Sequence, residues 1–147
     1  ATRIGVPVFG ICFGAQALAA ATGGSVQRAP APEIGWCRVD SAIPVLDATW
    51  FQWHQDAFTI GPDAELLATS PVGQQVFRVG RSVGVQFHPE VTGDHLAFWL
   101  SSGGATEMSA QGGDPEAVLG STREREPVGR AQVSALLDWY LEEVAGS

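Results

Sequence analysis

The chain has 147 residues, 45% of them hydrophobic and five of them tryptophan, which is enough to build the core of one domain and argues against disorder. Sixteen acidic against eight basic side chains give a formal net charge of -8. This charge argues against nucleic acid or an anionic membrane surface as the main partner and favours a small molecule or a protein.

The cysteines are few and are not arranged as metal ligands. Only Cys12 and Cys37 occur, and neither stands in a CxxC or Cys/His cluster of metal-site spacing, so we expect no metal. This usage suits a reducing compartment and predicts a cytoplasmic protein.

The start of the chain superficially resembles a signal peptide, because Arg3 precedes an apolar stretch that reaches Ala21. Pro7, several glycines and Gln16 interrupt the continuous apolar core that such a segment, or a membrane-spanning helix, would need. The first residue is Ala1 rather than methionine, and a buried type of strand follows almost at once. We therefore expect the N-terminus to be incomplete.

The first predicted strand leads directly into a cysteine flanked by glycines. The apolar run 6–11 predicts a fully buried strand of the kind found in parallel sheets, and residues 14–21 have the composition of a helix. Cys12 stands between them, with Gly10 and Gly14 two positions away on either side. A strand that turns into a helix at one residue strains that residue and needs small neighbours. Cys12 is thus a candidate nucleophile at a helix N-terminus, where a thiolate is favoured; an ordinary buried cysteine is the alternative.

Short strands are predicted after the first helix, which should end at Gly23-Gly24. Residues 29–32 contain two prolines and predict a loop, because proline removes a ladder donor and keeps the preceding residue extended. β-branched and aromatic content places the strands between Gly and Pro turns. The predicted strands are 25–28, 34–39, 49–53, 66–69, 75–79 and 83–87.

Helical spacing returns after Thr92, where Leu96 and Leu100 lie four residues apart. Asp114-Pro115 predicts the cap and first position of a second helix, and the polar, glycine-rich residues 102–113 predict a mobile loop before it. A final helix at about 128–144 carries an apolar stripe that we expect to pack on the core. The stripe consists of Val133, Leu136, Leu137, Tyr140, Leu141 and Val144.

His88-Pro89-Glu90 follows the last predicted strand and carries the second reactive group. Residues two apart in an extended chain point to the same side, so His88 and Glu90 can face one site. Cysteine-dependent hydrolysis needs an imidazole that takes the thiol proton and a third group that orients the imidazole. Each residue alone would be read as structural, but together with Cys12 they predict a catalytic set. His54 is the alternative candidate for the general base. No glutamate follows it in the His-x-Glu arrangement, although Asp56 stands at that position and partly imitates one. We therefore favour His88.

Three ordered motifs resemble those of class I glutamine amidotransferases. They are the string 6–16 (VPVFGICFGAQ), the string 84–90 (GVQFHPE) and the segment 53–56 (WHQD), the last in the form seen in stand-alone members akin to the amidotransferase domain of GMP synthase. The resemblance implies a flavodoxin-like three-layer αβα fold with a mostly parallel central sheet, a nucleophile elbow and missing N-terminal strands. It also implies one partial domain, 1–147, with a core carrying the site motifs at 1–101 and a helical C-terminal tail at 102–147.

The resemblance further implies a reaction. Cys12 attacks the side-chain amide of L-glutamine, ammonia leaves, and a glutamyl thioester is hydrolysed. His88 acts as base and then as acid, and Glu90 orients it. A synthetase domain or subunit would accept the ammonia, and the chain itself is expected to need no cofactor.

The substrate-binding residues are also implied by the resemblance. The backbone N–H of Phe13 matches one oxyanion donor, and Gln16 matches the family glutamine that holds the amino-acid end of the substrate. Trp53, Gln55 and Asp56 match the segment whose backbone binds the same end. An exposed helical glutamine and an ordinary aromatic strand end with a polar turn are the bland alternatives.

The sequence departs from the family pattern at its start. Family members carry further strands and a glycine-rich loop with the second oxyanion N–H ahead of the elbow strand, and no such residues precede Ala1. We therefore expect an exposed sheet edge and apolar surface. Two other functions stay open: a γ-glutamyl amide or peptide hydrolase with the same triad, and a catalytically incomplete binding or regulatory fragment.

Overall fold

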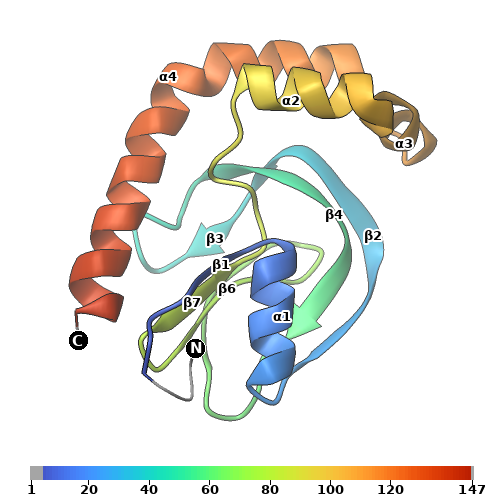
Figure 1. The fold of residues 1–147 in the computed structure, drawn as a ribbon. Coiled ribbons are helices and arrows are strands. Elements are labelled where there is room, and N and C mark those ends of the chain that lie inside the picture. The colour runs from blue at the N-terminus through green and yellow to red at the C-terminus, as the bar shows by residue number, and fades with distance from the viewer. Residues whose placement is uncertain (1–4, 147) are drawn as a thin grey trace.

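A five-stranded sheet forms the centre of the protein, as the ribbon in Figure 1 shows. The computed structural model describes residues 5–146, so Arg3 and Ile4 of the signal-like stretch lie outside the described residues. The strand order is β1-β7-β6-β5-β3, in which β1 and β7 run parallel and the other three neighbouring pairs run antiparallel. The strands are β1 (Phe9–Ile11), β3 (Asp40–Ser41), β5 (Glu65–Thr69), β6 (Gln74–Val79) and β7 (Ser82–Val85).

Helices cover both faces of this sheet. Helix α1 (Phe13–Ala21) packs one face through a cluster that includes Leu18 and Phe77. Helix α4 (Pro115–Trp139) and the π-helical turn η3 (Tyr140–Ala145) pack the other face, where Leu136 joins Val83 of β7. Alternate residues of the strands therefore serve opposite layers. The predicted flavodoxin-like α/β fold is confirmed, with a mixed sheet in the described residues.

Strands β2 (Ser25–Arg38) and β4 (Thr49–Thr59) form a separate antiparallel ribbon. The loop predicted at residues 29–32 is wrong, because β2 continues through both prolines. The pairing register nevertheless shifts there, from Arg28 opposite Asp56 to Glu33 opposite His54. The two prolines lack the N–H groups that the ladder needs, and the pairing is interrupted there by a bulge. A two-stranded ribbon tolerates this because β2 has a free edge.

The segment after the sheet is helical almost throughout. Helix α2 (Gly93–Trp99) starts at the Thr92 cap, and α4 starts at the predicted Asp114 cap, whose carboxylate accepts two backbone N–H bonds. The mobile loop predicted at 102–113 is wrong for most of its length, because η2 (Leu100–Gly104) leads into α3 (Ala105–Ala110), and the backbone leaves helical geometry only at a kink at Ser102 and Gly103 and after Ala110. Met108 of α3 is fully buried and packs with Phe51 and Leu96, which explains why a polar segment folds.

The last two predicted helices are one. Helix α4 runs through Pro127, and Figure 1 shows that it bends along its length. The predicted stripe is buried at Leu136, Tyr140 and Val144, whereas Leu137 and Leu141 face solvent. No helix within residues 5–146 has both the length and the apolar character needed to cross a membrane.

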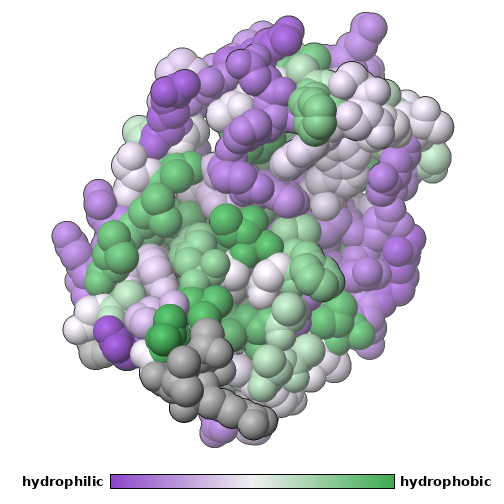
Figure 2. Space-filling model, viewed as in Figure 1, coloured by the Kyte–Doolittle hydropathy of each residue, from purple (hydrophilic) through white to green (hydrophobic). Residues whose placement is uncertain are grey.

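Apolar surface surrounds the edge strand β1. Figure 2 shows apolar side chains gathered on the face that carries β1 and α1. Val6 before the strand and Phe13 after it are exposed by 49% and 78%. In the described part of the chain, β1 has a strand neighbour on one side only, so this is the exposed apolar edge that the sequence predicts.

Candidate active site

Cys12 occupies a strained turn between β1 and α1. Its φ of 48° and ψ of -106° lie outside the helical and extended regions, and it is the one non-glycine residue with positive φ among residues 5–146. Its N–H donates to the carbonyl of Val85 at 2.8 Å, which fixes the turn to the end of β7. A side chain held in such a conformation projects from the sheet edge at the start of α1, where backbone N–H groups of the first helical turn lack helical partners.

Glycines let α1 approach the sheet closely at this turn. A Cβ on Gly10 would lie 2.7 Å from the carbonyl oxygen of Gly14, and a Cβ on Gly84 would lie 3.0 Å from the Cβ of Ala15 in α1. A Cβ on Gly14 would meet nothing within 4 Å. The sequence argument that both Gly10 and Gly14 must be small is therefore wrong for Gly14.

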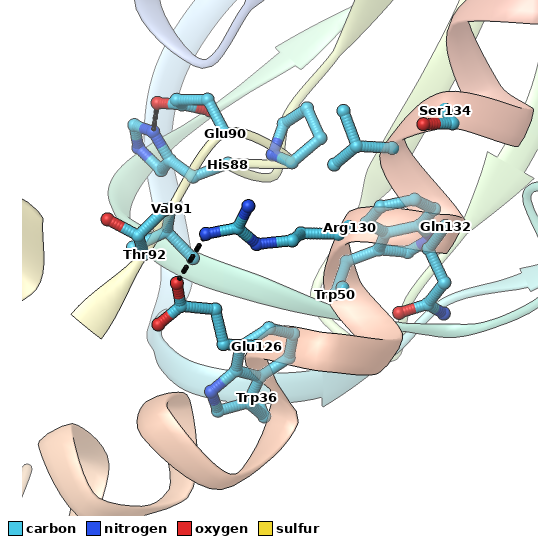
Figure 3. A pocket seen from close by; sticks show the side chains of 13 residues that line it. Trp36, Trp50, His88, Glu90, Val91, Thr92, Glu126, Arg130, Gln132 and Ser134 are labelled. Carbon is cyan, nitrogen blue, oxygen red and sulfur yellow. Dashed lines mark hydrogen bonds and ion pairs between the residues drawn. The ribbon is translucent and has the colours of Figure 1, made fainter.

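His88 and Glu90 lie on the segment that leaves β7. The His88 N–H donates to the carbonyl of Phe51 at 2.8 Å, which holds this segment against β4. The His88 Nδ1 atom lies 2.7 Å from Glu90 Oε1, and Figure 3 shows the two side chains turned toward one another. Burial alone would lower the pKa of His88, but hydrogen bonds and negative charge from Cys12 and Glu90 outweigh it and raise the pKa from 6.5 to about 9.

This pKa has a chemical consequence for the three residues. With this pKa the His88 imidazole carries a proton on each ring nitrogen at neutral pH; Nδ1 donates to the Glu90 carboxylate, and Cys12 is the other group whose hydrogen bond favours the charged ring. Such an arrangement supplies a nucleophile, a proton donor and an orienting carboxylate from one strand end and one elbow. The structure brings these three predicted residues together.

His54 lies elsewhere, in the ribbon of β2 and β4. Its Nδ1 is 2.9 Å from the Asp56 carbonyl oxygen, and its Nε2 is 2.9 Å from Glu33 Oε2. Both the His54 and Glu33 side chains are nearly fully buried, at 3% and 5% exposure. Both ring nitrogens are therefore engaged within the ribbon.

The predicted substrate-binding residues are divided between two places. Gln16 is buried rather than exposed, and its Nε2 donates to the Asp56 carbonyl at 3.2 Å. Gln55 instead donates to Glu107 of α3 at 3.3 Å and accepts a hydrogen bond from Arg28. The carboxylate of Asp56 pairs with Arg28 at 3.5 Å, so only the backbone of Asp56 faces Gln16.

The aromatic residues next to the site behave differently from one another. The ring of Phe13 is exposed, so only its backbone belongs to the elbow. Trp53 lies against Trp99, with ring centroids 6.1 Å apart, and Trp99 lies 5.5 Å from the His88 ring. These rings contribute to a cavity of about 440 Å³ that His88, Ser102, Gly104 and Glu107 complete.

A second cavity lies on the α4 side of the same histidine. It has a volume of about 500 Å³, and Figure 3 shows His88 and Glu90 at one end and the Glu126–Arg130 ion pair of α4 at the other. His88 thus lines both cavities. Sequence reasoning missed this α4 contribution, because nothing in the periodicity of a helix indicates which loop it will cover.

Sequence reasoning also assigned no role to Gln86. This side chain is fully buried, and its Nε2 lies 3.6 Å from the Cys12 sulfur. Its position two residues before His88 was the available signal, since alternate residues of an extended segment share a side.

The comparisons with known proteins agree on one family. The sequence model described as glutamine amidotransferase class-I matches residues 1–97. A GMP synthase [glutamine-hydrolyzing] of Mycolicibacterium paratuberculosis is 41% identical over 99 residues, which cover 60% of this chain and 19% of that protein. A GMP synthase [glutamine-hydrolyzing] of Tropheryma whipplei (strain Twist) is 32% identical over 155 aligned residues, covering 97% of this chain and 31% of that protein.

Solved structures extend the likeness to nearly the whole fold. A glutamine amidotransferase from Thermotoga maritima superposes with a TM-score of 0.86 at 31% identity, covering 96% of this chain and 65% of that one. A glutamine amido transferase from Methylobacillus flagellatus gives a TM-score of 0.84 at 25% identity and 97% and 65% coverage. The chain therefore spans about two thirds of these structures and less than a third of the two synthases. With its motifs, elbow and fold in agreement, the chain belongs to the class-I glutamine amidotransferase family.

Proposed function

We propose that this protein hydrolyses the side-chain amide of L-glutamine through Cys12, His88 and Glu90 and releases ammonia for transfer. The observation that carries the proposal is the placement of His88 beside a strained elbow cysteine and 2.7 Å from the Glu90 carboxylate, a setting that raises the pKa of His88 to about 9. A histidine in this setting is protonated at neutral pH and can deliver a proton to a leaving amine.

The first half of the reaction forms a thioester. The Cys12 sulfur attacks the side-chain carbonyl carbon of glutamine, and the electron pair of the C=O bond moves to oxygen. The Phe13 N–H at the start of α1 stabilises this oxyanion, a contact that typically contributes about 3 kcal/mol. His88 then gives its proton to the nitrogen, the C–N bond breaks, and ammonia leaves.

The second half consumes water. His88, now neutral, takes a proton from a water molecule that attacks the thioester carbon. The C–S bond breaks, glutamate leaves, and the proton held by His88 restores the starting ion pair with the Cys12 sulfur. Glu90 keeps the His88 ring in the same orientation throughout, because its carboxylate accepts the hydrogen bond that His88 Nδ1–H donates.

The amino-acid end of glutamine is assigned to Gln16 and the segment from Trp53 to Asp56. The Nε2 atom of Gln16 is already committed to the Asp56 carbonyl, so its Oε1 is the atom left to accept from the α-ammonium group. Gln55 and Asp56 would contribute through their backbone, since their side chains contact Arg28 and Glu107.

The acceptor of the ammonia is proposed from the relatives. Proteins named GMP synthase [glutamine-hydrolyzing] match this chain over a fifth to a third of their own length. We propose that a synthetase domain or subunit receives ammonia from this domain in the same manner.

A glutaminase assay on the purified protein tests the proposal. Glutamate release from glutamine is expected for the wild type and for Cys37→Ala, and none for Cys12→Ala. Turnover that survives Cys12→Ala would reject the mechanism. A strong preference for γ-glutamyl conjugates over glutamine would move the substrate to the conjugates. Failure of a glutamine-like electrophile to label Cys12 would favour a non-catalytic piece.

A further inference from the structure

Gln86 is the side chain that connects the elbow cysteine to the interior of the protein. It is fully buried, its Nε2 lies 3.6 Å from Cys12 Sγ, and its Oε1 accepts from Gln16 Nε2 at 3.3 Å. The Gln86 backbone N–H donates to the Gln75 carbonyl at 2.8 Å, which holds the residue against β6. Gln86 therefore has its backbone and both ends of its side chain fixed.

A backbone carbonyl dictates which end of each amide points where. The Asp56 carbonyl can only accept, so Gln16 must present its NH₂ group to it. The same NH₂ group lies against Gln86, which must therefore present its oxygen to Gln16. The remaining end of Gln86, its NH₂ group, is then the one that faces the sulfur. The orientations of the two amides therefore make the Gln86 NH₂ group the hydrogen-bond donor and the Cys12 sulfur the acceptor.

The Asp56 carbonyl, which fixes the orientation of both amides, is itself held in place by a second hydrogen bond. The Asp56 carbonyl also accepts from His54 Nδ1 at 2.9 Å, and the other ring nitrogen of His54 contacts the buried Glu33 carboxylate. A continuous set of hydrogen bonds thus runs from the β2–β4 ribbon through Asp56, Gln16 and Gln86 to the sulfur. Its Gln16–Gln86 and His54–Glu33 contacts are buried and its other hydrogen bonds partly buried, and a satisfied set of this kind favours one arrangement of its amides.

We propose that Gln86 is a positioning residue for the nucleophile: its amide N–H holds the Cys12 sulfur in the attacking orientation and favours the thiolate over the thiol. The inference rests on the proposed function, because it takes Cys12 as the nucleophile. A hydrogen bond donated to an anion is stronger than one donated to a neutral thiol, so removal of the donor costs the thiolate more than the thiol. His88 and Gln86, two residues apart, would then serve the same sulfur with a proton and a fixed dipole.

The pH dependence of Cys12 alkylation by iodoacetamide tests this directly. Alkylation reads the thiolate without any need for glutamine, and the second cysteine is a slow internal reference, since burial and the nearby Glu33 raise the pKa of Cys37 to about 11. Gln86→Met keeps the size of the side chain and removes the donor. We expect alkylation of Cys12 at neutral pH to fall about tenfold and its pH profile to move toward higher pH.

Gln52→Met is the matched control. Gln52 is equally buried, but its Nε2 donates to Gln75 Oε1 at 2.7 Å and not to the Cys12 sulfur. This substitution should leave the alkylation profile of Cys12 where it is, even if it lowers the melting temperature. Gln86→Glu is the second variant, for the case that Gln86→Met does not fold. Glutamate keeps the shape of glutamine but replaces the NH₂ donor with a carboxylate oxygen, so it should slow the alkylation of Cys12 at least as much as methionine does.

The outcomes separate this inference from the function on which it rests. A wild-type Cys12 that reacts no faster than Cys37 would remove the proposed nucleophile itself. A fast wild-type Cys12 together with an unchanged profile in folded Gln86→Met or Gln86→Glu would leave the nucleophile standing and overturn the role of Gln86.

Discussion

His54 Nε2 lies 2.9 Å from Glu33 Oε2, and the two residues stand directly opposite one another in the register of β2 and β4. The other ring nitrogen of His54 must carry a proton, because it faces a backbone carbonyl. A further proton must therefore lie between His54 and Glu33, whichever of the two carries it. Gln75 also donates to Glu33 Oε2, at 2.6 Å, so this oxygen serves two donors inside the protein.

This buried pair should matter for stability. Glu33→Ala leaves His54 Nε2 without its buried partner and leaves Gln75 Nε2 with the Ser70 hydroxyl alone, and breaking a buried pair of this kind typically costs about 3 to 5 kcal/mol in the free energy of unfolding. Arg28→Ala is the control, because it removes an ion pair of the same ribbon whose side chains are exposed, and such pairs are worth about 1 kcal/mol or less. Urea denaturation measures both. Equal losses for the two variants would contradict the distinction.

The close approach of α1 to the elbow predicts opposite results for two neighbouring glycines. Gly10→Ala places a methyl group against the Gly14 carbonyl and should destabilise the protein by about 1 to 3 kcal/mol. Gly14→Ala places its methyl group in open space within a helix and should be neutral or stabilising by up to about 1 kcal/mol. Thermal unfolding of the two variants checks this. A Gly14→Ala variant as unstable as Gly10→Ala would show that the elbow, rather than the contact, needs glycine.

Local signals in the sequence predict much of this fold. The turn at Cys12, the end of α1 near Gly23, and the starts of α2 and α4 are each specified by one or two residues whose backbone preferences decide the structure. The apolar runs predict β5, β6 and β7 within a few residues for the same reason.

Tertiary contacts decide the parts that the sequence did not predict. Residues 29–32 stay in β2 because the ribbon holds them on both sides of the bulge, and α3 forms because Met108 finds a buried place. The contact of Gln86 with Cys12 joins residues 74 positions apart, and the alignment of Glu33 with His54 depends on the register beyond the bulge. The backbone preferences of single residues cannot predict such contacts between distant parts of the chain.

The charge state of His88 should depend on the thiol. Cys12→Ala removes one of the hydrogen bonds and one of the negative charges that raise the pKa of His88 to about 9. The pKa of His88 should therefore fall, while His95 on the surface serves as an internal control. NMR titration of the three histidines measures this directly. An unchanged pKa in Cys12→Ala would mean that Glu90 alone accounts for the shift.

The same shift ties stability to pH with a definite sign. The folded protein holds the His88 proton more tightly than the unfolded chain, whose histidine has a pKa near 6.5. The resulting stabilisation is fully present below pH 6.5 and is lost as the pH rises through about 9. Unfolding free energies measured from pH 6 to 10 should decline across this window in the wild type and less so in His88→Asn.

Glu90→Gln should move the alkaline limit of the proposed glutaminase reaction. The Glu90 carboxylate accepts from His88 Nδ1 at 2.7 Å, and an amide in its place accepts the same bond without the negative charge. The pKa of His88 should drop, so the imidazolium that protonates the leaving amine is lost at a lower pH than in the wild type. In a profile of kcat/KM against pH, the alkaline limb should shift toward neutrality and the plateau should fall about tenfold or more.

Glu126→Gln is the matched control. This substitution neutralises a carboxylate of the same cavity that pairs with Arg130 and not with His88. The alkaline limb of this variant should stay near pH 9. If both variants shifted the limb equally, the effect would come from the general charge of the cavity rather than from the hydrogen bond to His88.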